Sequence, residues 1–328
     1  YSSEGWKINF KMDSNWDSQL QKLDGHFLQS QNWLKFQESL GQKLIVEKTD
    51  SYQWGGYVVD GRGGIKYLYI PYGPTLSDQN PDQALASIKL QAKEQGCMFV
   101  RFDQIQALSE KFLLQNGCKY FGEVQPRYTH MIDLSEDLAS IKSRMSKTDR
   151  NLINRSEKNG TKYSISDDPK MINIFLDLMM GTAQYKNYRA KSRNYLEKQL
   201  KFLLASGDAK IYMAEYEEDI VAGVVGVDWN GTRYYMHAGA NQEIIRKIPA
   251  SRGLAWYMIK DAKEKGMKTF DFYGVSEPGN KTHKWASVSG FKRSFGGQDK
   301  DFGGTWDLPV SRSKYVFYRL LKTILNKA

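Results

Sequence analysis

Cysteine and histidine are scarce in this chain, and their scarcity excludes several kinds of chemistry. The 328 residues include two cysteines, Cys97 and Cys118, which are too few for a disulfide framework and favour a reducing compartment. The four histidines are scattered, without the cysteine–histidine spacing typical of zinc sites. The sequence also lacks an HExxH motif, a GxSxG elbow and a GxxxxGK phosphate loop. We therefore expect neither a metal nor a cofactor, which leaves a reaction based on positioning and charge stabilisation.

Long hydrophobic runs are missing as well. No apolar run approaches the roughly 18 residues that cross a bilayer, and residues 1–6 lack a basic and then apolar leader. We therefore expect a cytoplasmic protein, with the inner face of the membrane as the alternative location. The composition, 41% apolar and 26% charged, is typical of a globular chain, and the length corresponds to two domains of about 150 residues each.

Basic residues outnumber acidic ones by 47 to 37, which gives a formal net charge of +10. An excess of this size favours polyanionic partners such as RNA, nucleotide diphosphates or anionic lipid headgroups. The alternative interpretation is a basic surface that serves only solubility.

Two stretches of the chain are similar to each other, which predicts a duplicated architecture. Residues 90–103 and 259–272 both contain Ala-Lys-Glu-x-Gly followed by a β-rich segment. A glycine at positions 96 and 266 indicates the C-terminal end of a helix, followed directly by a strand. Strand-like segments precede both copies, namely residues 56–60, 65–70, 209–216, 220–228 and 232–237. The sequence therefore predicts two α/β domains with mixed sheets and helices on both faces.

The boundary between the domains is placed at a helix-start signal. Residues 134–137 resemble a strand end followed by a helix N-cap, so we predict domains at residues 1–134 and 135–312. Residues 313–328 predict a closing helix with an apolar face formed by Val316, Leu320, Leu321 and Ile324. Periodicity leaves open whether this helix completes the first domain or packs on the second.

Residues 141–160 form the most concentrated basic segment of the chain. A polar helix or helix pair is expected over residues 139–159, with Lys147, Arg150 and Asn151 on one face. Two interpretations of this face remain open: it binds an anionic ligand, or it is only a solvated helix face. The cations of the segment are Lys142, Arg144, Lys147, Arg150, Arg155 and Lys158.

Two further segments place a lysine beside aromatic residues. Residues 290–297 contain Lys292 and Arg293 between phenylalanines and before a glycine pair, and we predict a strand with these cations on opposite faces. In one interpretation, one of these cations reaches into a cleft while the other stays in solvent. In the other interpretation, the segment is an ordinary surface strand. In the expected helix around residues 31–36, Trp33 and Phe36 are assigned to the core, while Lys35 projects elsewhere.

The order of the motifs along the chain resembles the FemABX family of non-ribosomal peptidyltransferases. The resemblance extends over nearly the whole chain. Its most specific parts are the Gln-Pro-Arg…Thr…Asp-Leu crossover at residues 125–134 and the Phe-Lys…Phe-Gly segment at residues 291–297. Supporting matches lie at residues 31–38, 69–74, 100–103, 147–160 and 271–274.

The resemblance implies an α/β fold of two GNAT-like (N-acetyltransferase-type) domains in tandem, with mixed, mostly antiparallel sheets and flanking helices. It implies transfer of an amino acid from aminoacyl-tRNA to an amine of a peptidoglycan precursor peptide, either UDP-MurNAc-pentapeptide or a lipid-linked precursor. Peripheral membrane contact is a further option, and a monomer is expected. Residues 170–207 are too few for the long helical arm that some members carry, so the chain resembles the compact, armless type.

The resemblance also implies roles for individual residues. Lys292 matches a lysine near the reacting ester or the phosphates and is the catalytic candidate. Lys35 matches a contact to the nucleotide diphosphate, and Tyr195 a tyrosine of the same binding cleft. Arg189 or Lys191 is the basic partner of Tyr195. The remaining substrate-binding candidates are Tyr72, His237, where a tyrosine is usual, and Arg293. Candidates for tRNA binding are Lys142, Arg144, Lys147, Arg150 and Arg155.

Two other classes of function stay open. An acyl-CoA-dependent N-acyltransferase of the GNAT type carries a Q/R-x-x-G-x-G/A loop, and residues 250–255 match it in part, with Arg252 and Gly253 at a helix start. A non-catalytic RNA-binding protein is favoured by charge alone.

Overall fold

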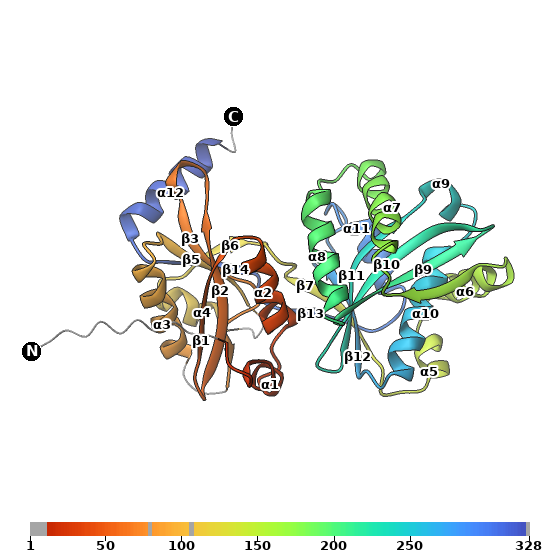
Figure 1. The fold of residues 1–328 in the computed structure, drawn as a ribbon, viewed down its shortest axis with the longest axis horizontal. Coiled ribbons are helices and arrows are strands. Elements are labelled where there is room, and N and C mark those ends of the chain that lie inside the picture. The colour runs from red at the N-terminus through yellow and green to blue at the C-terminus, as the bar shows by residue number, and fades with distance from the viewer. Residues whose placement is uncertain (1–11, 78–80, 105–107, 326–328) are drawn as a thin grey trace, which may run out of the picture. The chain divides into compact units, whose positions relative to one another are not determined.

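The computed structural model describes residues 12–77, 81–104 and 108–325, so the N-terminal stretch considered above lies outside it. The chain divides into two compact units, one of Tyr1–Arg127 with Asp301–Ala328 and the other of Tyr128–Lys300 (Figure 1). The expected division at residues 134/135 differs because the strand Tyr128–Asp133 pairs within the second unit. The C-terminal helix is assigned to the first unit.

The first unit is built on a mixed sheet. Its strands run in the order β1 (Lys43–Lys48), β2 (Tyr52–Asp60), β3 (Lys66–Ile70), β5 (Phe99–Asp103), β14 (Thr305–Pro309) and β6 (Lys119–Gly122), and β4 (Thr75–Leu76) pairs with β2. The strands predicted at residues 56–60 and 65–70 are confirmed as part of β2 and as β3, and they pair antiparallel with Tyr57 opposite Tyr69. Strands β3 and β5 are parallel, and β14 is antiparallel to both β5 and β6.

Helices cover the sheet of the first unit. They are α1 (Trp16–Lys22), α2 (Gln31–Ser39), α3 (Pro81–Glu94), α4 (Glu110–Gln115) and α12 (Arg312–Leu325), with short 3-10 turns at Phe27–Gln29 and Arg62–Gly64. Gly96 follows the end of α3, and its φ of 70° suits glycine, as predicted. In α2, Trp33 and Phe36 are buried as predicted, while Lys35 is exposed.

The second unit also has a mixed sheet. Its strands run in the order β13 (Gln298–Asp301), β7 (Tyr128–Asp133), β12 (Thr269–Val275), β11 (Thr232–Ala240), β10 (Asp219–Trp229), β9 (Ala209–Tyr216) and β8 (Lys162–Ser166). The parallel pairing of β11 with β12 is confined to Thr232–Tyr234 against Thr269–Asp271. Beyond that point the residues of β11 and β12 are no longer paired with each other.

Helices lie on both faces of this sheet. They are α5 (Leu138–Ser143), α6 (Lys147–Lys158), α7 (Met171–Tyr185), α8 (Arg193–Ala205), α9 (Gln242–Ile245), α10 (Ala250–Glu264) and α11 (Ala286–Arg293). Val224 packs in the core with α10, whereas a side chain on the neighbouring Gly223 would meet Phe175 of α7. Because successive strand residues face opposite sides, α7 and α10 cover opposite faces. Helix α7 lies so close to β11 that a Cβ on Gly239 would overlap the backbone of Met179.

Two expectations about local structure are wrong. Residues 290–297 are not a strand, because α11 runs through Arg293 and only then do Gly296 and Gly297 turn the chain with positive φ. In α12, Val316 and Leu320 of the predicted apolar face are exposed while Tyr315 and Tyr318 are buried, and the side chains of Leu321 and Ile324 lie outside the described residues. The predicted helix pair α5–α6 and the second helix–glycine–strand unit, α10–Gly266–β12, are confirmed.

No helix of the described residues is long and apolar enough to span a bilayer.

Candidate functional site

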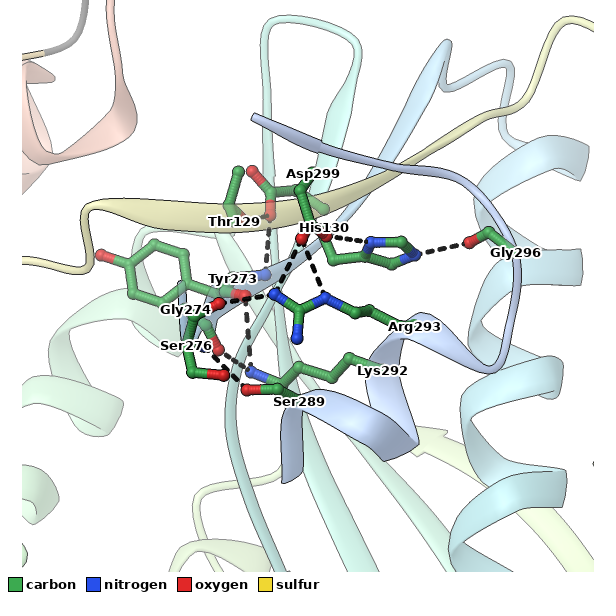
Figure 2. A network of polar contacts seen from close by, with 11 residues as sticks. Thr129, His130, Tyr273, Gly274, Ser276, Ser289, Lys292, Arg293, Gly296 and Asp299 are labelled. Atoms are coloured by element: carbon green, nitrogen blue, oxygen red, sulfur yellow. Dashed lines mark hydrogen bonds and ion pairs between the residues drawn. The ribbon is translucent and has the colours of Figure 1, made fainter. Parts of the chain in front are cut away.

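Lys292 is held at an irregular part of β12 (Figure 2). Its Nζ donates to the carbonyl oxygens of Gly274 at 2.7 Å and Tyr273 at 3.4 Å. These carbonyls are turned out of the ladder because the register with β7 shifts between Asp271 and Gly274, and Tyr273 has a φ of +59°. An ammonium has three N–H donors. The described residues supply these two acceptors, so at least one N–H of Lys292 remains available to a ligand.

The environment of Lys292 tunes its charge. The side chain is 9% exposed, and burial lowers the pKa of the ammonium to about 8, while the nearby Asp271 opposes that effect. Burial likewise raises the pKa of Asp271 to about 6. Asp271 Oδ1 accepts from the backbone N–H of Tyr273 at 2.6 Å and from the Thr129 hydroxyl. Asp271 therefore supports the bulge that presents the carbonyls to Lys292.

Arg293, expected to bind substrate, instead holds α11 in place. Its Nε donates to Asp299 Oδ2 at 2.8 Å, and its Nη2 donates to the carbonyl of Ser276. Asp299 Oδ1 lies 2.7 Å from His130 Nδ1, and His130 Nε2 lies 2.6 Å from the carbonyl oxygen of Gly296 (Figure 2). Both neighbours of the ring are acceptors, so a ring nitrogen that carries a proton donates to the neighbour that it faces. Sequence reasoning left His130 and Asp299 out of the site.

The hydrogen bonds of this network act on the charge of Asp299. Although burial raises the pKa of the Asp299 carboxyl, the hydrogen bonds from Arg293 and His130 bring it below its usual value. The backbone N–H of Ser276 donates to Ser289 Oγ of α11 at 2.7 Å, which adds a second tie between the helix and the end of β12. Lys292 is thus fixed from both its own helix and the strand it contacts.

A second group of predicted residues gathers along α8. Lys191 Nζ lies 5.8 Å from the centre of the Tyr195 ring, within range of a cation–π contact, and both Lys191 and Arg189 are exposed. His237 Nε2 of β11 lies 2.9 Å from Gln199 Oε1, and Gln199 follows Tyr195 by one helical turn. Burial lowers the pKa of His237 to about 4. Gln199 was missed, although its spacing of four residues from Tyr195 was a usable signal.

The candidates in the first unit have different surroundings. Lys35 is exposed on α2. Tyr72 is only 2% exposed, its hydroxyl donates to the carbonyl of Pro126 at 2.7 Å, and its ring packs against His26 and Phe302. Tyr72 is thus a packing residue of the first unit. A single groove shared by Lys35, Tyr195 and Lys292 stays a prediction, since these residues belong to different units.

The basic segment of α5 and α6 is largely engaged in local contacts. Arg150 Nη1 donates to the carbonyl of Ser143 at 2.8 Å, and Lys142 Nζ donates to Asn154 at 2.9 Å. Arg144 pairs with Glu136, and Arg155 donates to the carbonyl of Lys247. Lys147 is exposed at the start of α6. These contacts tie the cations to nearby residues, and the binding of an anionic ligand by this segment stays a prediction.

The start of α10, where a CoA pyrophosphate would bind, is occupied by side chains. Arg252 Nε donates to the buried carboxylate of Asp149, and its guanidinium lies 5.4 Å from the centre of the Phe291 ring. A Cβ on Gly253 would overlap the hydroxyl of Tyr163. A phosphate at this helix end would have to displace Arg252 from Asp149.

These observations define the class of fold: two α/β units, each with a mixed sheet and flanking helices. A family described as an acetyltransferase (GNAT) domain matches residues 143–285, within the second unit. The crystal structure of FemX is similar over 94% of this chain and 98% of that chain, with a TM-score of 0.81 and 16% identity. The resemblance to the FemABX family is therefore confirmed at the level of the fold.

Two further similarities concern sequence and fold. The aminoacyltransferase FemA of Staphylococcus epidermidis is 28% identical over 88 residues, which is 27% of this chain and 21% of that protein. The alignment thus spans about a fifth of the length of this curated relative. The C-terminal domain of a putative lysylphosphatidylglycerol synthetase from Agrobacterium fabrum has a TM-score of 0.57 and 13% identity, covering 87% of this chain and 88% of that chain.

Proposed function

We propose that the protein transfers the aminoacyl group of an aminoacyl-tRNA to an amine on the peptide of a peptidoglycan precursor. The similarity of fold to FemX and of sequence to FemA supports an acyltransferase of this kind. The observation that carries the proposal is Lys292, a buried cation with a donor to spare at a bulge of β12.

The chemistry needs little beyond alignment and charge stabilisation. The neutral acceptor amine attacks the ester carbonyl carbon, and the carbonyl π electrons move to oxygen to give a tetrahedral oxyanion. When this intermediate collapses, the amide forms and the ribose oxygen leaves with a proton that came from the amine. Alignment of two reactants can lower such a barrier by on the order of 7–11 kcal/mol. The free N–H of Lys292 would donate to the oxyanion, where a single donor is worth about 10²–10³ in rate.

The acceptor is expected to be held by its phosphates. Lys191 with Tyr195 offers a cation beside an aromatic ring on α8, and Lys35 offers an exposed cation on α2. A diphosphate suits such cations because each contact is charge-assisted. Lys292 then remains available for the reacting ester.

The test combines charged tRNAs with defined acceptors. Aminoacylated tRNAs are mixed with UDP-MurNAc-pentapeptide, a lipid-linked precursor or phosphatidylglycerol, and mass spectrometry identifies which acceptor gains an aminoacyl mass. Lys292→Met should reduce transfer about 10²–10³-fold. Lys198→Met, which removes an exposed lysine of α8, is the matched control and should leave the rate unchanged. Near wild-type transfer by folded Lys292→Met protein would remove the proposed role.

The same assay distinguishes the other classes. An acetyl-CoA arm tests a CoA-dependent acyltransferase, and the pairing of Arg252 with Asp149 disfavours that outcome. Salt-sensitive binding of tRNA without transfer to any acceptor would instead identify an RNA-binding protein.

A further inference from the structure

Helix α12 has one packed face and one bare apolar face. Tyr315 and Tyr318 are buried and pack on Phe99 of β5, so they fix the helix to the sheet of the first unit. Lys322 points the same way, with Nζ 3.7 Å from the centre of the Phe121 ring.

The opposite face consists of large apolar side chains in water. Val316, Phe317 and Leu320 are 57%, 62% and 60% exposed. Val316 and Leu320 lie one turn apart and Phe317 is adjacent, so the three form one ridge along the helix. This arrangement is unlike scattered surface leucines, because the ridge is continuous and its spacing is that of a buried helix face.

Cations flank this apolar ridge. The helix carries Arg312, Lys314, Arg319 and Lys322 and no acidic residue. At 100° per residue, Arg312 and Arg319 lie along one edge of the ridge and Lys314 along the other. An apolar strip bordered by basic side chains is the pattern of a helix that lies in the interface of a membrane, with its apolar side chains among the acyl chains and its cations among the headgroups.

We propose that the outer face of α12, formed by Val316, Phe317 and Leu320 and bordered by Arg312, Lys314 and Arg319, docks on an anionic lipid surface. A second copy of the chain fits less well because it would bring cations against cations. Three side chains also fall far short of the roughly 800 Å² per partner of a stable protein interface. The proposal goes beyond the proposed transfer reaction and does not rest on it, since it concerns the first unit and a binding event without chemistry.

The test measures binding of the full chain to sedimented vesicles. Wild-type protein should bind vesicles of phosphatidylcholine with about one-third phosphatidylglycerol much more tightly than vesicles of phosphatidylcholine alone, and added salt should weaken that binding. The triple variant Val316→Ser/Phe317→Ser/Leu320→Ser should lose at least about tenfold in partition coefficient because the apolar contact is gone.

Two further variants separate charge from fold. Arg312→Gln/Lys314→Gln should lose roughly fivefold per cation on the anionic vesicles and little on neutral ones. Leu90→Ser/Leu114→Ser removes exposed leucines, 54% and 49% exposed, from α3 and α4 of the same unit and should bind like wild type. Equal binding of the triple variant and wild type, or equal binding to both vesicle types, would overturn the proposal. A dimer that dissociates in the triple variant, measured by light scattering, would assign the ridge to a second copy instead.

Discussion

Lys292 combines burial with hydrogen bonds to two acceptors. Its two acceptors are backbone carbonyl oxygens, which bind a proton donor but cannot themselves release one. Burial lowers the pKa to about 8, and Asp271 limits the shift. At neutral pH the ammonium form of Lys292 therefore predominates, and a modest rise in pH is enough to deprotonate it.

This pKa predicts a pH dependence of transfer. A lysine with a lowered pKa releases its proton as the pH rises through about 8, so its help to the oxyanion fades above that value. Lys292→Arg keeps a charge that does not titrate in this range. The ratio of the wild-type rate to the Lys292→Arg rate should fall through about pH 8, whereas the ionisation of the acceptor amine affects both proteins alike. A constant ratio from pH 6 to 10 would show that the charge of Lys292 plays no part.

Some residues of the site could be identified from the sequence and others could not. Lys292 stood out through its neighbours Phe291 and Phe295, and Tyr195 through its place in an ordered set of motifs. His130 and Asp299 are separated by 169 positions in sequence and meet only because β13 lies beside β7. No local sequence pattern predicts a contact between residues so far apart in the chain.

At the scale of elements, α11 shows why a helix was missed. The glycines at residues 290, 296 and 297 suggested an extended segment, but a pair of aromatics four residues apart carried the correct signal. Phe291 and Phe295 lie on one helical side with ring centres 5.3 Å apart. Helix α12 illustrates a different error, since Val316 and Leu320 of its predicted apolar face are exposed while Tyr315 and Tyr318 pack on the sheet.

The position of α11 depends on Asp299, which joins Arg293 of the helix to His130 of β7. Asp299→Ala removes one acceptor from each of these two partners and leaves them only the carbonyls of Ser276 and Gly296, so the unfolding free energy of the second unit should fall by about 2–3 kcal/mol. Because Lys292 precedes Arg293, kcat should fall several-fold while KM changes little. Thermal melts and steady-state kinetics measure the two effects.

The matched control for this variant is another acidic residue of the same unit. Asp177 pairs with Arg193 at 2.7 Å, but its side chain is 71% exposed. Asp177→Ala should therefore cost less than about 1 kcal/mol and leave kcat unchanged. Equal losses for both variants would show that the buried network has no special part in positioning Lys292.

On the scale of the whole molecule, each sheet is completed by a strand from a distant part of the chain. Strand β14 follows the second unit in sequence, yet it lies between β5 and β6 of the first. Its Thr305 donates to the buried Asp103, as Thr129 of β7 donates to Asp271 in the second unit. The duplication predicted two α/β domains correctly. The predicted boundary differs from the observed one because β7 pairs in the second sheet and β14 in the first, and no local sequence pattern shows which sheet a strand joins.

The first unit should therefore depend on residues beyond the second. Without β14, Arg101 would lose both hydrogen bonds to Asp307, at 2.8 and 2.9 Å, and β5 would lose its antiparallel neighbour. Breaking a buried pair costs about 3–5 kcal/mol, a large share of the stability of a small domain. Residues 1–127 alone should accordingly show no cooperative thermal transition by circular dichroism.

A fusion should restore the fold of the first unit. The junction is short, because Phe302 N donates to the carbonyl of Arg127 at 2.8 Å and the Arg127 guanidinium forms two hydrogen bonds to Asp301, at 2.8 and 2.7 Å. Residues 1–127 joined through a few glycines to residues 301–328 should therefore melt cooperatively, and residues 128–300 should do so as a separate fragment. If residues 1–127 alone melt at the same temperature as the fusion, β14 contributes nothing to the first unit, and Arg101 must find its compensation elsewhere.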